Sequence, residues 1–159
     1  MKIFTIGYEG LDVHSFIALL LENDVQKVVD IRELPLSRKP GFSKRALAQR
    51  LTDSGLEYEH MVRLGCPKHV RDRYKIDGNW QQYTKGFLRH LSNQTEAIEE
   101  LAAIASDSSC ALLCFETDYR FCHRSFVADA VGCHSGGEVR HLAARNVKIA
   151  RPVLSLQPA

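Results

Sequence analysis

Two thiols, a carboxylate, an imidazole and a guanidinium lie close together in the last third of the chain. The residues that carry them are Cys114, Glu116, Cys122, His123 and Arg124. An apolar run over 110–115 precedes them and an amphipathic stretch begins at Cys122, a pattern that predicts a strand, a loop and a helix. In an open parallel sheet, the loop at the carboxyl end of a strand is where ligands bind. We therefore predict a functional site in this loop.

The first chemistry that this loop can support is anion binding beside a reactive thiol at Cys122. Backbone N–H groups at a helix N-terminus are unpaired and partly positive, so they stabilise an anion and help a thiol to lose its proton. His123 and Arg124 would strengthen both effects. We expect Cys122 to react faster than Cys110, which lies at the start of the apolar run. The structural alternative is that Cys122 packs as a small apolar residue and His123 bonds a backbone carbonyl.

A metal site is a second hypothesis, because the ligand types of zinc occur together in this segment. The candidate ligands are Cys114, Glu116, Cys122 and His123. No Cys-x-x-Cys pair occurs, so the spacing is not that of a zinc finger, and we assign no metal. Cys114 and Arg120 also have the spacing of a phosphatase loop, but two carboxylates and two aromatic residues between them oppose a phosphate cradle.

Acid–base catalysis is a further hypothesis, carried by Asp30 and Glu116. Each carboxylate follows an apolar run, so both are expected at strand ends and across one cleft. A carboxylate beside His and Arg can act as a general base or orient a water molecule. The structural alternative is that the two carboxylates pair with Arg32 and Arg124 and hold the loops together.

The elements that must position these groups alternate along the chain. Strands are expected over 3–6, 25–31, 56–60, 110–115 and 138–142, and helices begin near residues 12, 43, 80, 93 and 122. Residues 65–78 have no clear period and predict a loop or an irregular helix. The alternation predicts a Rossmann-like α/β domain of three layers, with a mainly parallel sheet and helices on both faces.

This architecture brings separated motifs to one place. Gly7–Tyr8, Asp30–Arg32 and Cys114–Glu116 all follow apolar runs, so they would meet at the carboxyl edge of the sheet. We expect one cavity at this edge. Its lining would be Tyr8, Asp30, Arg32, Glu116 and His123.

Length and composition are those of one globular domain. The chain has 159 residues, of which 45% are hydrophobic and 25% charged, and we predict a single domain over 1–159 with an extended tail over 145–159. No apolar stretch approaches the roughly 18 residues that span a bilayer, and no signal peptide is evident. A cytoplasmic protein without membrane contact is expected. Its five cysteines then predict free thiols.

The charge is unevenly spread although the net charge is only +2. Residues 32–75 contain eleven Lys or Arg and five Asp or Glu, whereas residues 95–119 contain six acidic residues and no basic one. Segregation of this kind can form a basic face that binds nucleic acid, or two solvated faces without a partner. On the nucleic-acid hypothesis, a surface that follows the phosphate backbone is formed by Arg38, Lys39, Lys44 and Arg45.

Three of these motifs carry a family resemblance. Thr5–Tyr8, Asp30–Arg32 with Pro35 and Ser37, and Cys114-x-Glu116 followed by Cys122–Arg124 occur in this order. Together they resemble the bacterial and archaeal family called domain of unknown function 488, over about Ile3 to Leu142. The resemblance implies a small α/β domain. It implies no particular reaction, because the biochemical role of the family is not settled.

These observations lead to one functional hypothesis and two alternatives. We expect a phosphate-bearing ligand, DNA, RNA or a nucleotide, in the strand-end cleft, with a hydrolase or transferase step as the enzymatic version. The catalytic candidates are Glu116, Cys122, His123 and Asp30. The ligand-binding candidates are Gly7, Tyr8, Arg32, Arg124, Arg38 and Lys39. The alternatives are a non-catalytic nucleic-acid-binding or regulatory module and a small metal-binding protein; no cofactor and no oligomeric state are assigned.

Overall fold

The computed structural model describes residues 1–144, so the tail expected over 145–159 lies outside the described residues. Its centre is one sheet in which every pair of neighbouring strands is parallel. The strand order is β3-β2-β4-β1-β5. The strands are β1 (Lys2–Gly7), β2 (Lys27–Asp30), β3 (Glu57–His60), β4 (Cys110–Cys114) and β5 (Glu138–Leu142). The predicted parallel α/β sheet is confirmed.

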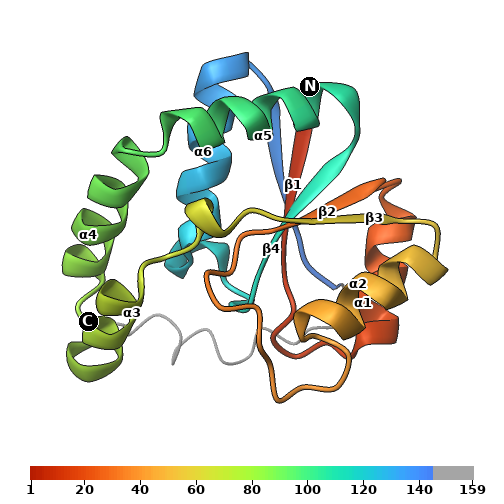
Figure 1. Cartoon of the computed structure of the whole chain (residues 1–159), viewed down its shortest axis with the longest axis horizontal. Coiled ribbons are helices and arrows are strands. Elements are labelled where there is room, and N and C mark those ends of the chain that lie inside the picture. The colour runs from red at the N-terminus through yellow and green to blue at the C-terminus, as the bar shows by residue number, and fades with distance from the viewer. Residues whose placement is uncertain (145–159) are drawn as a thin grey trace.

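Helices cover both faces of this sheet, as Figure 1 shows. One face is covered by α1 (Val13–Glu22) and α2 (Lys44–Asp53). The other is covered by α3 (Lys68–Asp77), α4 (Trp80–Ser92), α5 (Thr95–Asp107) and α6 (His123–Ser135). Short 3₁₀ turns occur at Val62–Leu64 and Tyr119–Phe121. No helix within residues 1–144 is long and apolar enough to cross a bilayer.

The sequence of β4 explains why this strand lies at the centre of the sheet. All five of its residues are buried, because the sheet is covered on both faces. Cys110 and Leu112 pack into the core below α4–α6, whereas Ala111 and Leu113 pack into the core below α1 and α2. A strand buried on both faces must be a continuous apolar run rather than an alternating one.

Helix α3 is the element that the sequence pattern failed to predict. Residues 65–78 were expected to be a loop or an irregular helix, but Lys68–Asp77 form a regular helix. Pro67 precedes its first residue, and Gly78 ends it in the left-handed conformation with φ of 61°. Only Val70 is buried in this helix. A single buried position gives no helical period, so the apolar pattern of the sequence could not predict this helix.

The chain connections diverge between β1 and β4. The connection after β1 leads to α1 on one face, and the connection after β4 leads to α6 on the opposite face. Neighbouring strands whose connections diverge in this way leave space at their carboxyl ends, which is where α/β proteins bind ligands. Gly7 and Cys114 are register partners at this point. The fold therefore places two of the predicted motifs side by side.

Gly7 gives the first testable prediction. A Cβ atom at this position would collide with the backbone carbonyl of Glu116, so Gly7→Ala must displace the loop after β4. We expect the free energy of unfolding to fall by about 2 kcal/mol or more. Urea unfolding followed by far-ultraviolet circular dichroism measures the change.

Gly132→Ala is the matched control, because Gly132 lies inside α6 and an added Cβ would meet its nearest neighbour at 3.5 Å. This variant should be unchanged or gain roughly 0.5–1 kcal/mol from helix propensity. Equal stability of the Gly7 variant and the wild type would contradict the close approach of the two loops.

Candidate functional site

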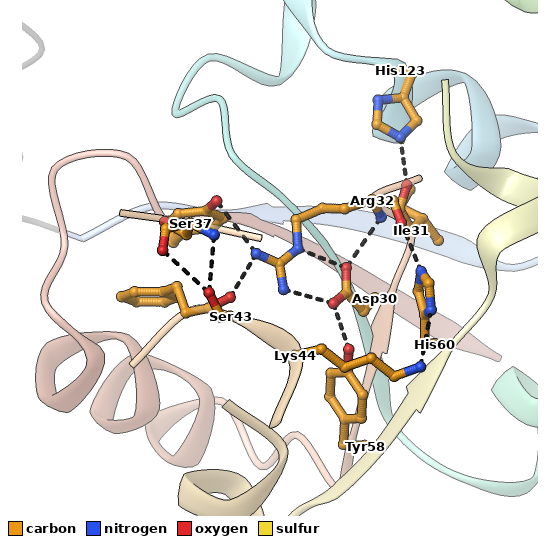
Figure 2. Close-up of polar contacts among 11 residues, drawn as sticks. Asp30, Ile31, Arg32, Ser37, Ser43, Lys44, Tyr58, His60 and His123 are labelled. Carbon is orange, nitrogen blue, oxygen red and sulfur yellow. Dashed lines mark hydrogen bonds and ion pairs between the residues drawn. The ribbon is translucent and has the colours of Figure 1, made fainter. Parts of the chain in front are cut away.

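A buried ion pair lies at the carboxyl edge of the sheet, at the end of β2. Asp30, the last residue of β2, is completely buried and accepts hydrogen bonds from Nε and Nη2 of Arg32 at 2.9 and 2.7 Å. The backbone N–H of Arg32 also donates to Asp30 Oδ1, and the Tyr58 hydroxyl donates to Oδ2 at 2.6 Å. Figure 2 shows this fork-to-fork arrangement. Both carboxylate oxygens are thus fully engaged within the protein.

The remaining donors of Arg32 hold two further segments. Nη1 donates to the carbonyl of Phe42 at 2.7 Å and to the hydroxyl of Tyr8 at 3.3 Å. The Tyr8 ring stacks on the Phe42 ring with a centroid distance of 4.4 Å. Arg32 and Tyr8 were candidate ligand contacts, and Asp30 was a candidate catalytic base. Their mutual contacts favour the structural alternative, in which these side chains hold the loops together.

Arg124 is the second buried guanidinium at this edge, and it lies in the first turn of α6. Its Nη1 and Nη2 donate to the carbonyls of Glu116 and Thr117, and its Nε donates to the Thr5 hydroxyl at 3.2 Å. The partners are neutral oxygens, so within residues 1–144 no carboxylate forms an ion pair with this cation. A buried cation without a carboxylate favours a negative charge nearby.

Two thiols and an imidazole meet beside Arg124. The sulfur atoms of Cys114 and Cys122 and the ring of His123 are buried and offer ligand atoms that all lie within 4.8 Å of one another. His123 Nδ1 is 3.6 Å from Cys114 Sγ and 3.9 Å from Cys122 Sγ. These are three of the four residues considered for a metal. The fourth, Glu116, lies outside the cluster that the geometry assembles.

The hydrogen bond of the second ring nitrogen, Nε2, decides which tautomer His123 adopts. His123 Nε2 is 2.8 Å from the carbonyl oxygen of Ile31, and a carbonyl can only accept. Nε2 therefore carries a hydrogen, which leaves a lone pair on Nδ1 of the neutral ring, directed at the two sulfurs. Figure 2 shows this contact with the end of β2. The expected backbone hydrogen bond of His123 is thus present, and it orients the other ring nitrogen for chemistry.

The surroundings shift the ionisation of these groups in different directions. Burial acts to raise the pKa of Cys122, but a hydrogen bond with Cys114 and the charge of Arg124 lower it well below its ordinary value. Burial raises the pKa of Cys110 to about 11. Both thiols are buried, and the lowered pKa makes Cys122 the thiolate candidate. That Cys122 reacts faster than Cys110 stays a prediction. Burial, followed by the nearby Cys122 and Glu9, raises the pKa of Glu116 to about 7.

The predicted motifs do lie at the same edge of the sheet. Asp30 ends β2 and Glu116 follows β4 at the same, carboxyl, edge of the parallel sheet. The surface hollow lined by Leu88 and Leu91 lies between helices, and the one lined by Gln26 lies at the amino edge. Neither involves the candidate residues, so a single cavity at the carboxyl edge stays a prediction.

Lys39 and Arg38 differ in what they do. Lys39 Nζ donates to the carbonyls of Tyr8 at 2.9 Å and Leu11 at 2.7 Å, so it anchors the loop after β2 to the loop after β1. Arg38 is exposed. Sequence reasoning missed the roles of Tyr58 and His60, whose side chains reach Asp30 and the carbonyl of Arg32. Their alternation in β3 was visible in the sequence, but their partners were not.

The fold and this edge define a class, a three-layer α/β protein with a buried ion pair and a buried thiol–imidazole cluster at the carboxyl ends of its strands. The family described as Domain of unknown function DUF488 matches residues 12–131. The chain belongs to this family, as its motifs predicted. The matched range is shorter than Ile3–Leu142 and leaves Gly7 and Tyr8 outside. No curated protein and no solved structure matches the chain.

The Asp30–Arg32 pair gives the second prediction. Asp30→Ala would leave the Arg32 guanidinium buried without its counter-charge, and breaking a buried pair in this way costs about 3–5 kcal/mol. We expect a loss of this size in urea unfolding. Glu138→Ala, which breaks the exposed pair with Arg140, is the control and should leave the unfolding midpoint nearly unchanged. Similar effects of the two substitutions would show that the buried pair does not organise the edge.

Proposed function

We propose that the protein binds a phosphate-bearing polyanion, nucleic acid, at the N-terminus of α2. Three exposed cations gather there: Arg38 in the preceding loop, and Lys44 and Arg45, the first two residues of the helix. A helix N-terminus presents unpaired N–H groups and the positive end of the helix dipole, which together favour phosphate. The single observation that carries the proposal is this coincidence of exposed cations and a helix start.

The start of α2 has no side-chain cap, although the N–H of its first residue, Lys44, donates to the carbonyl of Pro35 at 2.9 Å. Ser43 occupies the capping position, but its hydroxyl makes no cap hydrogen bond to the helix. The hydroxyl instead accepts from the N–H of Ser37 at 3.0 Å and donates to the carbonyl of Ser37 at 3.1 Å. Figure 2 shows these contacts, which hold Ser37, the residue before Arg38, beside the residue that precedes α2. The first turn also contains no acidic residue that would repel a phosphate.

Lys44 connects this surface with the carboxyl edge. His60 Nε2 lies 2.7 Å from the carbonyl of Arg32 and therefore carries a hydrogen. The lone pair on Nδ1 can then accept from the Lys44 ammonium group, at 3.4 Å. Figure 2 shows Lys44 reaching over the sheet edge toward His60. The cation is thus held near the loops that follow the strands.

The contacts of the basic residues favour the start of α2 over the strand ends as the phosphate site. Arg32 and Arg124 are buried and engaged with protein oxygens. Arg38, Lys44 and Arg45 take part in no ion pair among the described residues. The proposal is therefore one of binding at the surface, because Arg124, the described cation beside Cys122, already donates to two backbone carbonyls.

We also propose a cytoplasmic location. All five cysteines are free thiols, and four of them are buried. A reducing compartment maintains thiols in this state.

The third prediction concerns salt dependence. A fluorescently labelled single-stranded oligonucleotide should bind weakly and with little sequence preference, and its affinity should fall steeply with salt, because each neutralised phosphate releases counterions. Replacing Arg38, Lys44 and Arg45 with Ala should make the slope of log affinity against log salt shallower by about 2. Fluorescence anisotropy at several salt concentrations measures the slope.

The matched control removes the same charge from the other side of the sheet. Lys75, Lys85 and Arg89 are exposed on α3 and α4, and their replacement with Ala also removes three positive charges. This control should keep most of the wild-type slope. Equal slopes for both triple variants would place binding elsewhere, and no binding at low salt would remove nucleic acid as the partner.

A further inference from the structure

We propose that Cys114, Cys122 and His123 form a zinc site with an open coordination position. The inference goes beyond polyanion binding and is independent of it, because it uses none of the cations around α2. It concerns a buried centre at the carboxyl end of β4, where His123 also reaches the carbonyl of Ile31 just after β2.

The distances fit tetrahedral coordination. Zinc binds thiolate sulfur at about 2.3 Å and imidazole nitrogen at about 2.0–2.1 Å, so a sulfur and a nitrogen on the same ion lie roughly 3.6 Å apart. The corresponding separations are 3.6 Å from Cys114 Sγ and 3.9 Å from Cys122 Sγ to His123 Nδ1. With all three ligand atoms within 4.8 Å of one another, these separations are close to those that one bound ion requires.

The imidazole is already oriented as a ligand. Metal-binding histidines usually donate their second ring N–H to a carbonyl or carboxylate, which fixes the ring and its tautomer. His123 Nε2 makes this contact with the carbonyl of Ile31. The ring of Phe87 packs edge-on against the imidazole at a centroid distance of 5.1 Å. Nδ1 is thereby held toward the two thiols.

The donor set selects the ion. Two thiolates and one imidazole suit zinc, whereas magnesium and calcium require oxygen ligands. Two thiolates also neutralise a divalent cation, so the bound ion adds no net charge beside the buried guanidinium of Arg124. Cys114 ends β4, Cys122 is the N-cap residue of α6 and His123 is its first residue, so the ligands are held at the ends of two regular elements. Three protein ligands leave one position for water or a substrate, as in catalytic zinc sites.

The test begins with the wild-type chain, purified under reducing conditions, stripped with a chelator and titrated with zinc. Isothermal calorimetry should give one ion per chain. X-ray absorption of the loaded protein should show two sulfur neighbours at about 2.3 Å and at least one nitrogen at about 2.0–2.1 Å. A shell made only of oxygen and nitrogen, or no binding tighter than that of magnesium, would overturn the proposal.

Substitutions then assign the ligands. Cys114→Ser and Cys122→Ser should each weaken zinc binding by more than about 100-fold, because even the loss of an outer-shell partner costs 10–100-fold. Cys133→Ser, which changes the exposed cysteine, is the control and should bind as the wild type does. Circular dichroism checks the fold of each variant, and the absorption spectrum of the wild type decides the case if a variant does not fold. Unchanged affinity in both folded cysteine variants would overturn the assignment.

Discussion

The buried pair of Asp30 and Arg32 is the interaction on which the carboxyl edge depends. Burying two charges is costly and is tolerated only where the geometry is good and the remaining donors are satisfied. Here the guanidinium meets the carboxylate with two parallel hydrogen bonds and uses its other nitrogen for Phe42 and Tyr8. The pair thus connects the end of β2 with the loop after β1 and with the segment before α2. Tyr58 adds β3 to the same network.

This constraint divides the basic residues into two kinds. Arg32, Arg124 and Lys39 donate to oxygens of the protein and shape the loops. Arg38 and Arg45 stay exposed around the start of α2. A positive charge that already has buried partners offers little to a phosphate, whereas an exposed one can replace the counterions condensed on the nucleic acid. The proposed polyanion surface is therefore formed by the exposed cations around α2 and not by the buried arginines at the strand ends.

Arg124 links the loop architecture to the thiol cluster. Its guanidinium closes the loop after β4 by bonding two carbonyls, and its charge lowers the pKa of Cys122. Gly7 makes the close approach possible, because any side chain at this position would collide with the same loop. The residues that hold the loop in place are thus also those that create a thiolate environment next to His123. The proposed zinc site is a consequence of this packing.

The sequence by itself determined the layered α/β fold, the strands and most helices, the family, and the meeting of three motifs at one edge. These follow from local apolar periodicity and from the rule that parallel strands end together. It could not show that Lys68–Asp77 is helical, because Val70 alone is buried there. Only the tertiary structure decided which arginines are buried, that Glu116 lies outside the thiol cluster, and that His123 presents Nδ1 to it. Burial and side-chain direction arise from contacts between residues far apart in the chain, such as Ile31 with His123, and no local pattern encodes them.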